Sequence, residues 1–289
     1  MTLRPTLVTC KQSQEDLAIA VCAAIGGTLT PQPSAQTPDI KEAVREFCTP
    51  VRSLRGGFEE ELVRSGTEVR LSNSVAGVVW GEGPRTLLVH GWCGRGTQLG
   101  GFVAPLLTAG RSVMAIDCWG HGDSPGTESH GVKFSECILL ADKEFGSFHS
   151  VVGHSVGGAA TLIAINRGLR LERVVLLAPP SIARVVREFG GRNDFSDLEI
   201  TEFTRELSLQ SGFSLEQVDM VSIAPRIQTP ILIFHDEADR TVSIKSSEQF
   251  VERCASAVLR KVPGVGHLRI MRSKEIIRQS VSFIVDGTK

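Results

Sequence analysis

The feature that most constrains this chain is a repeated alternation of short apolar runs with stretches of helical spacing. After residue 85 the apolar runs recur at 86–89, 112–116, 150–152, 174–177, 231–234 and 257–260. Stretches of helical period separate most of them, and in 132–145 one helix face carries Phe134, Cys137, Ile138, Ala141 and Phe145. Strands that alternate with helices favour a mostly parallel sheet that is covered on both faces. The pattern therefore predicts an α/β fold.

Three parts of the chain depart from this alternation. The runs 67–71 and 75–80, with Asn73 between them, have the pattern of a hairpin. Residues 181–225 are richer in charge and too long for an ordinary connection between strands, so they predict a helical insertion. Residues 1–57 predict an N-terminal extension of one or two helices and a linker. The core is then expected to comprise residues 58–180 and 226–289.

The extension contains one apolar run, Leu17 to Ile25. Acidic residues directly precede it, where a secretory signal would carry positive charge, and it is too short to span a bilayer. We therefore expect a helix that packs on the body of the protein, and no membrane span. The seven cysteines are odd in number and lack CxxC spacing, which is typical of a reduced intracellular protein. A cytoplasmic location follows as an expectation.

The stretch Ile233–Arg240 contains the letters DEAD, which RNA helicases use for metal-binding carboxylates. A nucleotide-driven motor would also need a P-loop lysine and a basic track for phosphates. The glycine spacings at Gly91–Gly96 and Gly153–Gly158 both lack that lysine. The 31 basic and 32 acidic residues nearly balance, and no basic cluster stands out. These observations argue against a helicase and against nucleic acid as a partner.

The glycines at 153–158 are better explained by a serine motif than by a P-loop. Gly153-His-Ser155-Val-Gly157-Gly158 is a G-x-S-x-G between a predicted strand and a predicted helix. Ser155 would then lie on a sharp strand-to-helix turn, where glycines are needed because neighbouring backbone passes too close for a side chain. The helix that begins there points its free N–H groups toward the hydroxyl and toward a developing oxyanion. Ser155 is therefore a candidate nucleophile.

A serine hydroxyl needs a base, which is usually a histidine that a carboxylate orients. Asp239 follows a predicted strand, and His267 lies in a glycine-flanked loop after the next strand. We predict that Asp239 orients His267, while Asp236 and Glu237 are loop residues. Asp236 stays open as an alternative acid. A metal site built from His235 and the two aspartates is disfavoured, because neither a motif nor a second histidine supports it.

The front of the predicted core contains a candidate oxyanion site. Leu87–Gly94 ends a strand with a His-Gly-Trp loop. The backbone N–H of Trp92, together with that of Val156 after the serine, would make the two-donor site that acyl transfer requires. A tight glycine-rich turn, Ile116–Ser124, follows the next strand.

The ordered motifs HGW, D-x-x-G-H-G-x-S, G-H-S-x-G-G, H-x-x-x-D and a late G-x-G-H resemble the α/β-hydrolase fold superfamily, over roughly residues 67–285. The resemblance implies a mostly parallel eight-stranded sheet flanked by helices, no cofactor, and a small helical lid at 181–225. Two residues depart from the family pattern. The family usually has Gly where Asp236 stands, and Cys93 lies beside the candidate oxyanion donor.

The resemblance also implies a serine hydrolase in which Ser155, Asp239 and His267 form the catalytic triad. We expect it to cleave carboxylic esters of a small to medium, largely apolar acyl group through an acyl-enzyme. A thioesterase that acts on acyl-thiols is the close alternative. A catalytically silent ligand-binding protein on a hydrolase scaffold is the alternative of another class, and a homodimer is left open. Serine at the nucleophile position disfavours dehalogenase and epoxide hydrolase chemistry.

The insertion 181–225 carries apolar residues at spacings that suit short amphipathic helices. If it is a lid, its inner face would help to form an apolar acyl pocket, and Phe189 and Phe203 are the rings expected there. The alternative is a set of helices that only pack on the periphery.

Overall fold

A computed structural model describes residues 39–72 and 74–287 of the chain. The predicted helix at 17–25 lies outside these residues. The described chain contains an eight-stranded sheet. Its strands are β1 (Thr67–Leu71), β2 (Val75–Trp80), β3 (Arg85–Val89), β4 (Ser112–Asp117), β5 (Ser150–His154), β6 (Arg173–Leu177), β7 (Ile231–His235) and β8 (Ala257–Lys261).

The strand order is β1-β2-β4-β3-β5-β6-β7-β8. Strand β2 is antiparallel to both of its neighbours, and every other adjacent pair is parallel. The predicted mostly parallel eight-stranded sheet is therefore confirmed. The central strands are buried along nearly their whole length, which explains why they are continuous apolar runs in the sequence.

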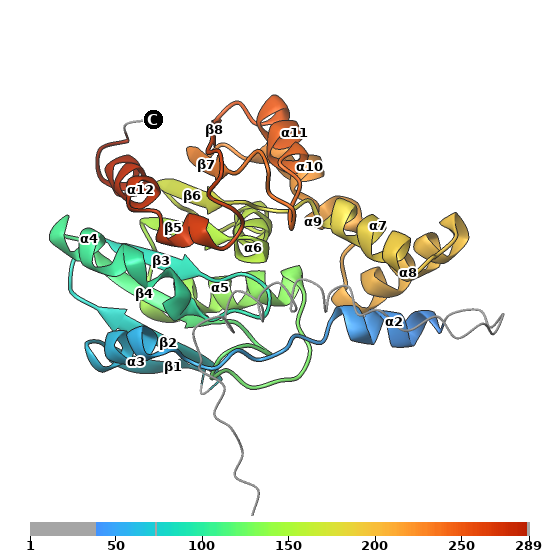
Figure 1. The fold of residues 1–289 in the computed structure, drawn as a ribbon. Coiled ribbons are helices and arrows are strands. Elements are labelled where there is room, and N and C mark those ends of the chain that lie inside the picture. The colour runs from blue at the N-terminus through green and yellow to red at the C-terminus, as the bar shows by residue number, and fades with distance from the viewer. Residues whose placement is uncertain (1–38, 73, 288–289) are drawn as a thin grey trace, which may run out of the picture. The chain divides into compact units, whose positions relative to one another are not determined.

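Helices cover both faces of this sheet (Figure 1). One face packs against α3 (Gly57–Arg64), η1 (Gly96–Phe102), α4 (Val103–Thr108), η3 (Arg269–Arg272) and α12 (Lys274–Asp286). The other packs against α5 (Gly131–Phe145), α6 (Val156–Asn166), α10 (Met220–Ile223), η2 (Ala224–Arg226) and α11 (Lys245–Arg253). Helix α6 begins directly after Ser155 and is apolar on almost every side, because it lies between the sheet and the neighbouring helices α5 and α10.

Residues between β6 and β7 form α7 (Ile182–Arg192), α8 (Asp197–Ser211) and α9 (Leu215–Val218), followed by α10 and η2. Ser181 begins α7 as its N-cap, and Ser196 and Glu199 form a capping box that begins α8. The predicted helical character of this insertion therefore agrees with the structure. Its role as a lid stays a prediction.

The apolar face of α7 and α8 packs against α2 (Ile40–Phe47), a helix of the N-terminal extension. The Phe47 ring lies edge-on to Phe189 at 5.2 Å and to Phe203 at 5.5 Å between ring centroids. Phe189 is 2% exposed and Phe203 is fully buried. The prediction that these two rings line an acyl pocket is therefore wrong, because α2 covers the face that they were expected to present.

We expect Phe203→Ala to lower the free energy of unfolding by about 3–5 kcal/mol, because it leaves a cavity in this aromatic cluster. Urea denaturation would measure the loss. The matched control is Leu209→Ala on the same helix, whose side chain is 64% exposed and whose removal should change stability by less than about 0.5 kcal/mol. If Phe203→Ala kept the wild-type stability and changed the preference for acyl chain length, this account would be wrong, and Phe203 would line the acyl pocket.

Candidate active site

The candidate nucleophile lies at the carboxyl edge of the sheet, between β5 and α6. Ser155 has φ 50° and ψ −126°, a conformation that non-glycine residues rarely adopt. Its N–H donates to the carbonyl of Leu177 at the end of β6, at 2.8 Å, which holds the turn against the neighbouring strand. The backbone thus turns sharply at Ser155, as the G-x-S-x-G motif predicts.

Two glycines make this turn possible. A Cβ on Gly157 would come within 2.3 Å of the carbonyl oxygen of His90. A Cβ on Gly153 would come within 2.8 Å of the Cα of Gly158 on the other side of the turn. Real Cβ atoms do not approach backbone so closely, so only glycine allows β5, α6 and the loop after β3 to meet here.

The structure brings the candidate base and acid together, although they are 28 positions apart in sequence. His267 Nδ1 lies 2.7 Å from Asp239 Oδ2, and the Asp239 side chain is fully buried. The other oxygen of Asp239 accepts the N–H groups of Thr241 and Val242 at 2.8 and 3.0 Å. Burial raises the pKa of Asp239. The hydrogen bond to His267 and these N–H donors lower it by more, so the net pKa is below its usual value. An ionised Asp239 can therefore hold a proton on Nδ1 and leave Nε2 free to act as a base.

His154, the residue before the serine, is a contact that sequence reasoning missed. Its Nε2–H donates to the backbone carbonyl of His267 at 2.9 Å, and the two rings lie 4.8 Å apart. Burial lowers the pKa of His154 to about 3, with the nearby His267 as a smaller cause, so the ring is neutral at physiological pH. The only signal in the sequence was that the residue before the serine is a histidine. That signal does not reveal which residue the histidine contacts.

The two candidate oxyanion donors come from the loop after β3 and from the first turn of α6. Among the described residues, no turn or loop carbonyl accepts the N–H of Trp92. Val156 is the first residue of α6, and an N–H in the first turn of a helix has no acceptor within that helix. Gly91 lies against the serine, since a Cβ there would come within 3.1 Å of the Cβ of Ser155. Both N–H groups thus belong to backbone beside Ser155.

His90 holds the first of these loops in shape. Its Nδ1–H donates to the carbonyl of Gly91 at 2.6 Å, and its Nε2 accepts the N–H of Cys118 at 3.0 Å. Burial lowers the pKa of His90 to about 4, so the neutral ring can make both contacts. The Trp92 ring packs edge-on against His121 at 5.0 Å. The position of the loop is therefore determined by a buried polar and aromatic cluster.

With this geometry in place, the chain matches the Alpha/beta hydrolase family over residues 86–279. It belongs to the α/β-hydrolase family. Among solved structures, this α/β-hydrolase is similar to a bromoperoxidase from Bacillus anthracis (TM-score 0.57, 19% identity, 77% of this chain and 100% of that chain). It is also similar to an esterase from Exiguobacterium antarcticum (TM-score 0.56, 16% identity, 76% and 99%). Identities this low show a shared fold alone.

A curated relative is a serine hydrolase-like protein of Dictyostelium discoideum. It is 29% identical over 129 residues, which cover 41% of this α/β-hydrolase and 34% of the relative. The chain thus spans about a third of the length of that relative.

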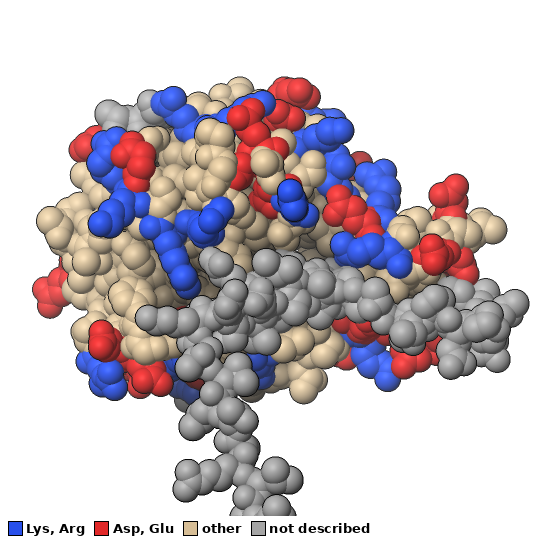
Figure 2. All heavy atoms as spheres, viewed as in Figure 1, with Lys and Arg blue, Asp and Glu red and all other residues tan. Residues whose placement is uncertain are grey.

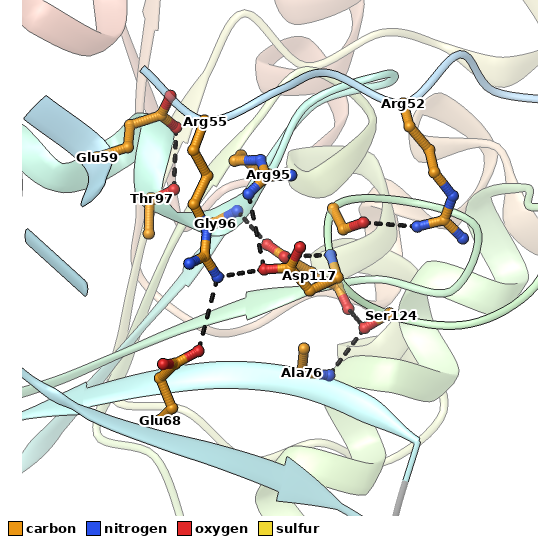
Figure 3. Close-up of polar contacts among 12 residues, drawn as sticks. Arg52, Arg55, Glu59, Glu68, Ala76, Arg95, Gly96, Thr97, Asp117 and Ser124 are labelled. Atoms are coloured by element: carbon orange, nitrogen blue, oxygen red, sulfur yellow. Dashed lines mark hydrogen bonds and ion pairs between the residues drawn. The ribbon is translucent and has the colours of Figure 1, made fainter. Parts of the chain in front are cut away.

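In this α/β-hydrolase, the connection between α2 and α3 runs along loops of the candidate site. The Val51 N–H donates to Cys93 Sγ, beside Trp92, at 3.2 Å. Arg52 donates to the carbonyls of Gly122 and Gly126 at 2.6 and 2.7 Å. Figure 3 shows Arg52 reaching the loop after β4. The N-terminal extension therefore contacts the turns that follow both β3 and β4.

Farther along the same connection, Arg55 forms ion pairs with Asp123 and Glu68. Figure 3 shows Arg55 reaching Glu68. A cavity of about 340 Å³ lies beside them, lined by side chains of both charge signs, and Ser155, Asp239 and His267 are not among its lining residues. Basic and acidic side chains are likewise interspersed on the face of the molecule that Figure 2 shows.

Two searches of the described residues gave negative results. Within 39–72 and 74–287, no group of three or more His, Cys, Asp or Glu side chains is placed to hold a metal ion. None of the helices in that part of the chain has the length and apolarity needed to cross a membrane.

Proposed function

We propose that this α/β-hydrolase is a serine hydrolase that cleaves carboxylic esters. The observation that carries the proposal is the 2.7 Å contact between His267 Nδ1 and the buried Asp239 carboxylate. It is joined by a serine on a strained strand-to-helix turn, whose preceding residue, His154, hydrogen-bonds the backbone of His267. An ionised carboxylate, a histidine and a serine on such a turn are the groups that acyl transfer needs. The family membership and the esterase with the same fold agree with this choice of reaction.

In the first half of the proposed reaction, Ser155 Oγ attacks the acyl carbon while His267 Nε2 takes its proton. Asp239 keeps the imidazole in the required tautomer and stabilises the imidazolium. The N–H groups of Trp92 and Val156 donate to the oxyanion, whose charge develops only in the transition state. His267 then protonates the leaving alcohol, and an acyl-enzyme on Ser155 remains.

In the second half, water attacks the acyl-enzyme with His267 again as the base. The carboxylic acid leaves, and its departure restores Ser155. We propose an acyl group of small to medium size that is largely apolar, because the side chains of Trp92 and Val156, on either side of Ser155, are apolar and pack against an apolar core cluster. The alcohol half of the ester is left open by this reasoning.

The proposal is tested with p-nitrophenyl esters of graded acyl length and with a fluorophosphonate probe. An esterase should release p-nitrophenol with a pre-steady-state burst, and the probe should label Ser155 as located by peptide mass spectrometry. Acyl-thiol substrates measured in parallel would identify a thioesterase by their higher kcat/KM. A protein that binds acyl ligands without burst, turnover or labelling would be a binding protein, and the proposal would fail.

A further inference from the structure

The Asp236 carboxylate has no part in the mechanism above, yet it is almost completely buried, at 2% exposed. It directly follows the last residue of β7. Its Oδ1 accepts the N–H of Ala238 at 2.9 Å and that of Gly264 at 3.3 Å. Its Oδ2 accepts the N–H of Gly266. One carboxylate thus receives three backbone donors from two separate loops.

These donors belong to the two loops that carry the candidate acid and base. Ala238 is in the turn that bears Asp239, and the Asp239 N–H itself donates to the backbone carbonyl of Asp236 at 3.1 Å. Gly264 and Gly266 have φ of 73° and 75° in the loop that leads into His267. Left-handed backbone at both positions is readily adopted only by glycine. The carboxylate therefore joins the acid turn to the histidine loop.

The neighbouring carboxylate shows that this arrangement is particular to Asp236. The Glu237 side chain is 53% exposed, and its ion pair with Lys261 has a separation of 3.9 Å. At Asp236, burial raises the pKa, but the N–H donors of Gly266, Ala238 and Gly264 outweigh it, and the net pKa lies below the usual value. The carboxylate is therefore ionised at neutral pH, and its hydrogen bonds are the stronger, charge-assisted kind.

We infer that Asp236 is a positioning residue, which holds the loop of His267 in register with the turn of Asp239. The inference rests on the proposed function of Ser155 and His267. Three contacts then hold His267: Asp239 on the ring, His154 on the backbone carbonyl, and Asp236 on the loop just before it. Without the Asp236 carboxylate, the N–H groups of Gly264 and Gly266 would hydrogen-bond to water instead, and the loop that leads into His267 would shift. A displacement of about 1 Å at a reacting group can lower the rate by about 10²-fold.

The test compares Asp236→Asn with Glu237→Gln in the full-length chain. The amide has nearly the same shape as the carboxylate, but it replaces one acceptor oxygen with an N–H donor, so at least one backbone N–H would face another donor. We expect kcat on a p-nitrophenyl ester to fall about ten- to hundredfold while KM changes little, because the loss concerns positioning and not substrate binding. Glu237→Gln should keep the wild-type kcat.

A second measurement needs no turnover. Hydrogen–deuterium exchange of the peptide that contains Gly264 and Gly266 should become about tenfold faster in Asp236→Asn and stay unchanged in Glu237→Gln. Unchanged exchange would overturn the inference, and so would faster exchange with wild-type kcat. Asp236→Gly provides a second variant if the asparagine protein does not fold. A wild-type chain with no esterase activity would instead refute the proposed function, and the exchange data would still decide whether Asp236 holds the loop.

Discussion

Ser155→Ala and His267→Ala are each expected to lower kcat for an activated ester by on the order of 10³-fold or more. The first change removes the nucleophile, and the second removes the group that takes its proton. Neither residue belongs to a hydrophobic core cluster of the described chain, so either truncation should leave the core intact. Steady-state kinetics with a p-nitrophenyl ester, on variants whose thermal unfolding matches the wild type, would measure the loss.

The double variant adds a second criterion. Because the two residues act as a unit, Ser155→Ala combined with His267→Ala should be little worse than either change alone. His149→Ala is a suitable control. His149 directly precedes β5, at the start of that strand and not at its carboxyl end, and its ring pairs with Glu172. This variant should keep the wild-type kcat. If either single variant kept more than about a tenth of the wild-type kcat, the assignment of nucleophile and base would be wrong.

Asp239→Asn should lower kcat by on the order of 10³- to 10⁴-fold, which is far more than Asp236→Asn. The reason is the tautomer of His267. Asp239 accepts a hydrogen bond from the Nδ1–H group, whereas an asparagine can present its own N–H there and favour a ring with the proton on Nε2. A ring in that state cannot take the proton of Ser155. Asp236 accepts only backbone N–H groups in the structure, so its amide variant leaves the tautomer unchanged.

The ranking of these two variants, measured side by side, decides between the carboxylates. A larger loss in Asp236→Asn than in Asp239→Asn would move the acid to Asp236. Equal and small losses would point to a carboxylate elsewhere. Asp117 would then be tested next, although its two oxygens already accept the N–H groups of Gly96 and Asp123 at 2.8 Å each.

Much of the fold could be predicted from the sequence because buried strands and helix faces produce local patterns of apolar residues. Strands β5 and β7 are buried on both faces, so their apolar runs were visible without any tertiary information. Helix α5 buries one face only, and its 3.6-residue period predicted its bounds to within a residue. The serine turn was equally visible, because its glycines are required by close backbone contacts within a few residues of Ser155.

Contacts between distant segments produce no such local pattern in the sequence. The apolar faces of α7 and α8 looked the same in sequence whether they covered a pocket or another helix, and only the structure showed α2 packed against them. The sequence likewise showed Asp236 as one more carboxylate in a loop. Its role depends on Gly264 and Gly266, which are brought to it by the parallel pairing of β7 with β8.

The sequence by itself therefore determined the class of fold, the strands and the order of the candidate catalytic residues, since each of these follows from local spacing and burial. The tertiary structure decided which side chains meet at the carboxyl edge of the sheet: His267 with Asp239, His154 with the backbone of His267, and Asp236 with the histidine loop. The physical reason is that a hydrogen bond is directional and acts over about 3 Å, whereas the residues that form it here are separated by up to 113 positions along the chain.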